Sequence, residues 1–170
     1  MKIIAKKPFW LFCTLTFILI FYISACGYNI YSRSHLPFSE ISIGLIENRT
    51  IEPKLQDKLH KALIEEFIKH GVRINTAARL KLTGIIHHFD MSSLSEKNGI
   101  TAEYRIFINA DFKLQDDTGK TTEIKNIASP FIDSFTGSEN LGKLIASKEM
   151  AEEMALSNIS MQLIGTLIYK

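Results

Sequence analysis

Apolar residues occupy every even-numbered position from Ala102 to Leu114, with mainly polar residues between them. This alternation predicts a long β-strand with one buried face, because successive side chains on a strand point to opposite sides of the sheet. Such a strand belongs to a sheet that is covered on one face and open on the other. The run Asp116-Asp117-Thr118-Gly119 is typical of a tight turn, so residues 121–128 are predicted to return as the second arm of a hairpin.

Two shorter alternating runs predict further strands. In the first, the predicted buried residues are Ile41, Ile43 and Leu45, with Ile46 on the other side. In the second, the residues predicted to share one side are Leu80, Leu82, Ile86 and His88. His87 and His88 would then point to opposite faces, which excludes a shared metal. Gly84 indicates a bulge or a close backbone approach. Residues 91–99 are polar and rich in serine, so a loop is predicted there, and Phe135 is predicted to extend the hairpin beyond a bend at Pro130.

Helical spacing of apolar residues occurs in two stretches. The first contains Leu55, Leu59, Leu63, Ile64, Phe67 and Ile68, with Pro53 predicted in its first turn and Gly71 just past its end. The second runs from Leu141 toward the C-terminus, and Glu149, Glu152 and Glu153 mark its predicted polar side. Its apolar residues spread so widely that we expect the sheet and the first helix to bury it. Docking of a partner on part of it is the alternative.

The order strand, helix, three strands, helix predicts an α+β two-layer sandwich, with both helices packed on one face of a four-stranded sheet. The other face of the sheet is then left open to water or to a polar partner. The charged residues predicted on this open face are Arg79, Lys81, Glu103, Arg105, Asp111, Lys113, Glu123 and Lys125.

Residues 1–25 are predicted to be an export signal. Three lysines precede an apolar run from Phe9 to Ile23, and two small residues, Ser24 and Ala25, come directly before Cys26. This end of the signal resembles the bacterial lipobox, in which the chain is cut before the cysteine and the cysteine is acylated. We therefore expect a lipidated tether over residues 26–39 and one domain over residues 40–170. An uncleaved membrane anchor is the alternative, although the run is shorter than the ~20 residues that a spanning helix needs.

Charge and cysteine content exclude several classes of function. Loss of Lys2, Lys6 and Lys7 with the signal changes the formal net charge from +2 to −1, so the basic isoelectric point is no argument for nucleic-acid binding. Cys13 leaves with the signal and Cys26 carries the lipid, so no thiol remains for a disulfide, a cysteine nucleophile or a cysteine zinc site. We expect no catalytic residues, no metal site and no cofactor, and therefore no enzyme.

Several short motifs occur in the order of a known family. Cys26-Gly27-Tyr28 begins the predicted mature chain, Glu47-Asn48-Arg49-Thr50 and Glu52-Pro53 lead into the first helix, and Leu82-Thr83-Gly84-Ile85-Ile86 forms the next strand. With these motifs the chain resembles the LptE family of lipopolysaccharide-assembly lipoproteins, best over residues 26–90. Two positions depart from the family pattern, since Lys54 stands where a glycine is expected and Arg79 where an aspartate is expected.

The resemblance implies an outer-membrane lipoprotein that plugs the lumen of a β-barrel, the lipopolysaccharide translocon LptD, and helps to deliver lipopolysaccharide to the outer leaflet. Gly27 after the lipidated cysteine fits sorting to the outer membrane. Because barrels of this class are polar inside, we expect Arg105 and Lys113 to contact the barrel or the passing head group. The alternatives are a pilot lipoprotein for another outer-membrane secretion pore, and a lipid-anchored enzyme or ligand-binding domain of the periplasm.

Overall fold

A computed structural model of the chain describes residues 36–97, 100–129, 133–138 and 140–169. The chain divides into two compact units, Met1–Ser32 and Arg33–Lys170, and every element described belongs to the second. The predicted signal peptide, Cys26 and most of the tether lie outside the described residues.

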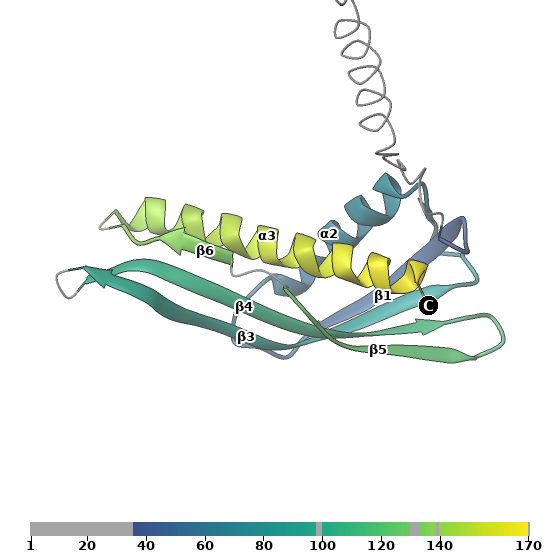
Figure 1. Ribbon diagram of the computed structural model, residues 1–170. Helices are drawn as coiled ribbons and strands as arrows, with labels where there is room; N and C mark the ends of the chain where they lie inside the picture. Colours follow the sequence, from purple (N-terminus) through teal and green to yellow (C-terminus); the bar gives the residue numbers. More distant parts are fainter. Residues whose placement is uncertain (1–35, 98–99, 130–132, 139, 170) are drawn as a thin grey trace, which may run out of the picture. The chain divides into compact units, whose positions relative to one another are not determined.

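The second unit is an α+β domain with both helices on one face of a sheet, which confirms the predicted fold class (Figure 1). Its elements are β1 (Glu40–Asn48), α2 (Leu55–Lys69), β2 (Arg73–Ile74), β3 (Lys81–Lys97), β4 (Ile100–Gln115), β5 (Thr121–Ala128), β6 (Asp133–Thr136) and α3 (Leu141–Ile168). The sheet has six strands, where the sequence predicted four. The two additional strands, β2 and β6, are too short to produce a clear alternation in the sequence.

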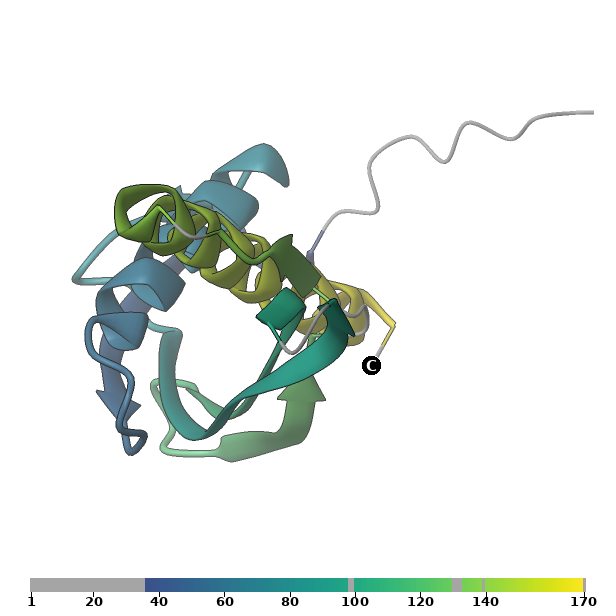
Figure 2. The ribbon, with the colours of Figure 1, turned by 90° about the vertical axis from the view of Figure 1, so that its left-hand side faces the viewer.

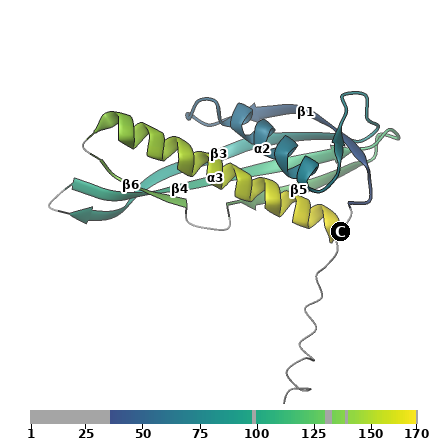
Figure 3. The ribbon, with the colours of Figure 1, turned by 90° about the horizontal axis from the view of Figure 1, so that it is seen from above.

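The strand order is β2-β1-β3-β4-β5, and β6 also pairs with β4. The long strand β4 therefore shares one edge between two partners: β5 pairs with residues 109–115 and β6 with residues 103–106. Seen from the end and from above, α2 lies over β1, and α3 crosses β4, β5 and β6 (Figures 2 and 3). The opposite face of the sheet, with its polar side chains, therefore has no covering layer among the described elements.

The core forms between the helices and the even-numbered row of β4, as the alternation predicted. Its fully buried residues include Leu55, Leu59, Leu63, Phe67, Leu82, Ile86, Ile108, Ala110, Leu156, Ile159 and Leu163. Each large apolar side chain in this set stabilises the fold by about 1.5–3 kcal/mol relative to exposure. The end of the predicted tether joins this core, since Leu36 is buried and the Phe38 ring lies 6.3 Å from that of Phe67.

Two bulges reverse predicted side-chain directions. The register of β1 against β3 shifts between Ile43 and Ile46, so Leu45 is 75% exposed and Ile46 is 6% exposed. A second shift, between Ile86 and His88, turns His88 to the open face, where its ring lies 5.7 Å from Phe107. The predicted burial of Leu45 and the predicted side of His88 are therefore wrong, because a bulge inserts one residue and inverts the alternation beyond it.

Strand β3 is also longer than predicted. Residues 91–97 continue the strand and pair with β4, for example Met91 with Ile106 and Ser93 with Tyr104. The serines do not oppose this, because the ladder uses backbone groups and β4 presents a full row of them. Gly84 is confirmed as a close approach, since a β-carbon there would lie 3.0 Å from the ring of Phe112.

Helix α2 begins after Lys54, so Pro53 precedes the helix and is not in its first turn. Its C-terminal end is the one predicted. Gly71 has a φ of 78°, its N–H donates to the carbonyl of Ile68 at 2.9 Å, and the N–H of Val72 donates to the carbonyl of Phe67 at 3.0 Å. This pair of bonds is a Schellman motif, which satisfies the last carbonyls of the helix and favours glycine at the left-handed position.

Alanine at Gly71 should lower the free energy of unfolding by about 1 kcal/mol, because a β-carbon disfavours the left-handed conformation. Steric contact is not the cause, since no atom lies within 4 Å of the added carbon. The matched control is Gly165→Ala in the interior of α3, which also meets no atom and should raise stability by about 0.5–1 kcal/mol. Urea unfolding measures both changes, and equal signs would contradict the assignment.

Helix α3 carries a buried carboxylate that the sequence placed on the polar side. Glu152 is 2% exposed, and its Oε2 lies 2.6 Å from the Lys58 ammonium on α2. Lys148 lies 3.5 Å from Glu152 Oε1 and 2.7 Å from Glu52, which precedes α2. Burial opposes the charge of Lys148, but the hydrogen bond to Glu52 and the two carboxylates prevail and raise its pKa above the ordinary value. The network therefore joins both helices through Lys148 in its charged form.

The outward side of α3 keeps part of its apolar surface exposed. Met150, Met154 and Met161 are 65%, 58% and 46% exposed. No helix in the described ranges is both long and apolar enough to cross a membrane. Burial by the sheet and α2 thus accounts for one side of α3 only, and docking of a partner on the other side stays a prediction.

Candidate functional site

The two predicted contact residues lie on the open side of β4, opposite its buried row. Arg105 and Lys113 are eight positions apart on one strand, which separates their α-carbons by about 27 Å. They therefore form two separate contact points and do not share one small anionic group.

Arg105 is half-buried between its two neighbouring strands. It pairs with Ser92 on β3 and with Ser134 on β6, and its guanidinium donates to the Ser92 hydroxyl at 3.2 Å. The nearby Glu103 accepts instead from Ser134, at 2.8 Å. The buried Nε of Arg105 has no hydrogen-bond partner among the described residues. The guanidinium is thus held in place while its charge remains available to an external anion.

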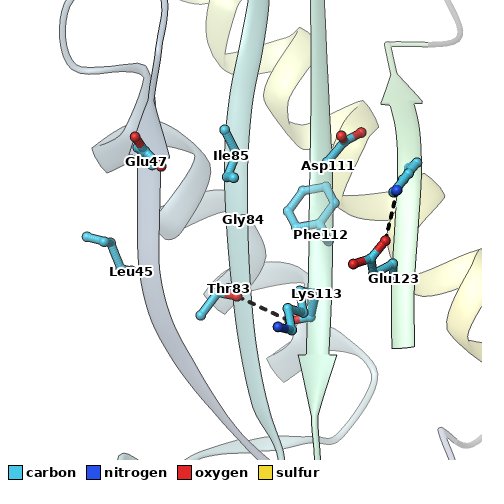
Figure 4. A pocket seen from close by; sticks show the side chains of 10 residues that line it. Leu45, Glu47, Thr83, Gly84, Ile85, Asp111, Phe112, Lys113 and Glu123 are labelled. Atoms are coloured by element: carbon cyan, nitrogen blue, oxygen red, sulfur yellow. Dashed lines mark hydrogen bonds and ion pairs between the residues drawn. The ribbon is translucent and has the colours of Figure 1, made fainter. Parts of the chain in front are cut away.

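Lys113 lines a hollow of about 400 Å³ on the same face (Figure 4). The hollow is bounded by Leu45, Glu47, Thr83, Gly84, Ile85, Asp111, Phe112, Lys113, Glu123 and Lys125. Figure 4 shows their side chains coming from four adjacent strands. The Lys113 ammonium has no ion-pair partner within the described part of the chain, whereas Lys125 lies 2.8 Å from Glu123.

Asp111 sits where two bulges flank β4. Residues 125 and 126 both oppose it on β5, and its Oδ1 accepts from the N–H of Asn126 at 2.7 Å. Asn126 has a φ of 58°, which asparagine tolerates better than most residues. On the other side, His87 Nδ1 lies 3.9 Å from Asp111 Oδ2. Asp111 therefore fixes the local shape of the face, a role that the sequence did not reveal.

Exposed ion pairs neutralise other charges on this side. The hydrogen bond from Lys125 lowers the pKa of Glu123, and that from Arg49 lowers the pKa of Glu47. Arg79 lies 3.7 Å from Asp117. Such exposed pairs contribute little to stability, but they leave Arg105 and Lys113 as unpaired cations along the open side of β4.

Both adjacent histidines lie on the open face, contrary to the prediction that they diverge, because the bulge at His87 turns His88 outward. In the described ranges, no group of three or more His, Cys, Asp or Glu side chains is placed to hold a metal ion.

Comparison with known families gives a match over most of the domain. The family model for LptE, lipopolysaccharide-assembly, matches residues 38–169. The chain belongs to the LptE family. The protein is thus an envelope lipoprotein with a role in lipopolysaccharide assembly. The family is not enzymatic. Among curated proteins, none matches the sequence.

Solved structures of other lipoproteins share the fold. The rare lipoprotein B from Shewanella oneidensis has a TM-score of 0.52 at 15% identity, covering 75% of this chain and 92% of that one. A minor lipoprotein from Acinetobacter baumannii has a TM-score of 0.51 at 12% identity, covering 79% of this chain and 93% of that one. At these identities the similarity concerns the fold alone.

Proposed function

We propose that this LptE-family protein is anchored in the outer membrane through Cys26, plugs the β-barrel of a lipopolysaccharide translocon and assists transport of lipopolysaccharide to the outer leaflet. The observation that carries the proposal beyond family membership is the open sheet face with Arg105 and Lys113 unpaired. The lumen of a large barrel is polar, so a polar, uncovered sheet face suits it better than an apolar one.

The two cations differ in what they offer a partner. The half-buried guanidinium of Arg105 is already positioned by Ser92, so it loses little side-chain entropy when it binds a carboxylate or a phosphate. Lys113 is exposed, and its ammonium has no hydrogen-bond partner among the described residues, so it acts mainly as a point charge at the hollow. Arg105 is therefore expected to contribute more to binding than Lys113.

Charge reversal at both positions tests this assignment. Arg105→Glu with Lys113→Glu should lower recovery of the barrel with the tagged protein, and the export of lipopolysaccharide, at least tenfold. A loss of about 1.4 kcal/mol per tenfold change is within the range of charge-assisted hydrogen bonds. Lys61→Glu is the control, because Lys61 is an exposed cation on α2. Normal assembly and normal export in the double variant would refute the contact face.

The chemistry of the hollow argues against a ligand-binding domain as the main function. Asp111 is occupied by the Asn126 N–H, and Glu123 by Lys125. Few polar groups in the hollow are left to converge on a small molecule, which a selective pocket requires. A pilot lipoprotein for a secretion pore shares the anchor and the fold, and identification of the barrel that co-purifies separates it from the proposal.

A further inference from the structure

We propose that the loop between β1 and α2, residues 49–54, is a rigid docking knob. Its tip, formed by Ile51 and Pro53, inserts into an apolar socket with an acidic rim on the barrel partner. The inference rests on the proposed function, because it names a point at which that partner is held.

The tip is the most exposed apolar site among the large hydrophobic residues described. Ile51 is 98% exposed, and Pro53 is exposed beside it. Leu55, four residues after Ile51, is 0% exposed in the core. Single apolar residues on a surface are common and need no explanation. Ile51 differs from them in the construction of the loop that carries it.

Hydrogen bonds inside the loop hold its backbone. Asn48 Oδ1 accepts from the Thr50 N–H at 3.0 Å and from the Thr50 hydroxyl at 2.8 Å. The Asn48 amide donates to the carbonyl of Glu52 at 2.7 Å, and the N–H of Glu52 donates to the Thr50 hydroxyl at 3.2 Å. The polar side chains on either side of Ile51 are thus used to fix the turn around it.

A salt bridge ties the same loop to α3. The Glu52 carboxylate lies 2.7 Å from the Lys148 ammonium, and both side chains are largely buried, at 17% and 26% exposure. Lys148 in turn contacts Glu152 in the core network. The loop is therefore pre-organised, so a partner that binds its tip does not have to order it, which favours affinity.

The charges of the loop indicate the chemistry of the socket. Arg49 is neutralised by Glu47, with both hydrogen bonds at 2.9 Å, and Glu52 is neutralised by Lys148. Lys54 is exposed and has no ion-pair partner within the described residues. It also holds a φ of 64°, a conformation rare for a residue with a β-carbon. The tip thus presents an apolar surface beside one unpaired cation, and its complement is an apolar socket with a carboxylate at the rim.

The test uses the full chain with a C-terminal affinity tag, produced in its own cells and extracted from outer membranes. Ile51→Gln removes the apolar tip, and Lys54→Glu reverses the adjacent charge. Ile68→Gln is the matched control, because Ile68 on α2 is also a highly exposed isoleucine, at 58%. We expect Ile51→Gln to reduce barrel recovery at least tenfold and Lys54→Glu about fivefold, and Ile68→Gln to change it by less than twofold. The thermal unfolding midpoints of the Gln variants should match that of the unchanged protein.

A photo-reactive amino acid at position 51 gives an independent readout and should form an adduct with the barrel, whereas the same group at position 68 should not. If Ile51→Gln recovers as much barrel as the unchanged protein, and position 51 forms no adduct, the knob is refuted while the proposed function stands. If the unchanged protein recovers no barrel, the proposed function fails and this inference fails with it.

Discussion

The Glu152→Ala variant is expected to lose about 2–4 kcal/mol of stability toward unfolding, because it leaves two lysines in a partly buried site without their shared carboxylate. Lys58 and Lys148 are only 20% and 26% exposed, so water compensates incompletely for the lost partner. The effect should be large for a single substitution, since Glu152 joins α2 and α3 through contacts 94 residues apart in the chain. Urea unfolding with a two-state fit measures it.

Glu149→Ala is the matched control, because Glu149 is also a glutamate on α3 but lies on the exposed side of the helix. It should change stability by less than about 0.5 kcal/mol. Equal losses from the two substitutions would contradict the buried network.

The pH dependence of the same variant provides a second check. A raised pKa of Lys148 in the folded state means that its contribution is complete below the pKa of the unfolded chain and is lost as the pH rises through the folded value. The ordinary value is 10.5, so this loss belongs to strongly alkaline solution. The alkaline decrease in stability should be smaller in Glu152→Ala than in the unchanged protein, and an equal decrease would argue against the pairing.

The Cys26→Ser variant should move the protein from the outer-membrane fraction to the soluble periplasmic fraction or retain it, uncut, at the inner membrane. Stable anchoring requires two or more acyl chains. A serine at position 26 cannot carry the thioether lipid, and if residues 23–26 form a lipobox, the signal is not cleaved before a serine. Cys13→Ser is the matched control, because it changes the other cysteine and should leave localisation unaffected. Fractionation and the intact mass of the mature N-terminus measure the outcome.

Outer-membrane localisation of Cys26→Ser would contradict the lipid anchor. A mature protein that still contains residues 9–25 would favour the uncleaved membrane anchor instead.

The sequence predicted the structure correctly where the apolar residues of an element recur at one regular spacing. The middle of the even-numbered row of β4, from Ile106 to Phe112, is buried as predicted, and α2 ends at Gly71 through a capping motif that glycine makes favourable. In both elements the decisive contacts lie on one regular face or within one turn, so neighbouring residues carry the information.

The predictions failed where contacts with another element of the fold determine the direction or burial of a side chain, or the length of a strand. The bulges that expose Leu45 and turn His88 outward are set by pairing between strands, and a single sequence shows no sign of the inserted residue. The spacing within α3 predicts Glu152 on the polar side of the helix. It is buried because Lys58, which belongs to a distant part of the chain, and Lys148 neutralise it. The polar run 91–97 becomes a strand because β4 extends far enough to pair with it.

The motif that carried the family resemblance also acquires a structural explanation. Asn48 and Thr50 close the turn after β1, Glu52 connects it to α3, and Lys54 takes the left-handed conformation at the position where a glycine was expected. The contact residues of the open face and their separation along one strand follow from the alternation alone, but the position of Arg105 between Ser92 and Ser134 required the register of β4.

The most direct measurement is the identity of the protein that binds this one. The full chain, tagged after Lys170, is extracted from outer membranes in mild detergent, and the material that co-purifies is identified and quantified. The proposed function predicts one large β-barrel of the lipopolysaccharide translocon type in a stoichiometric amount. A secretion pore in its place, or a preparation without any barrel, would contradict the plug.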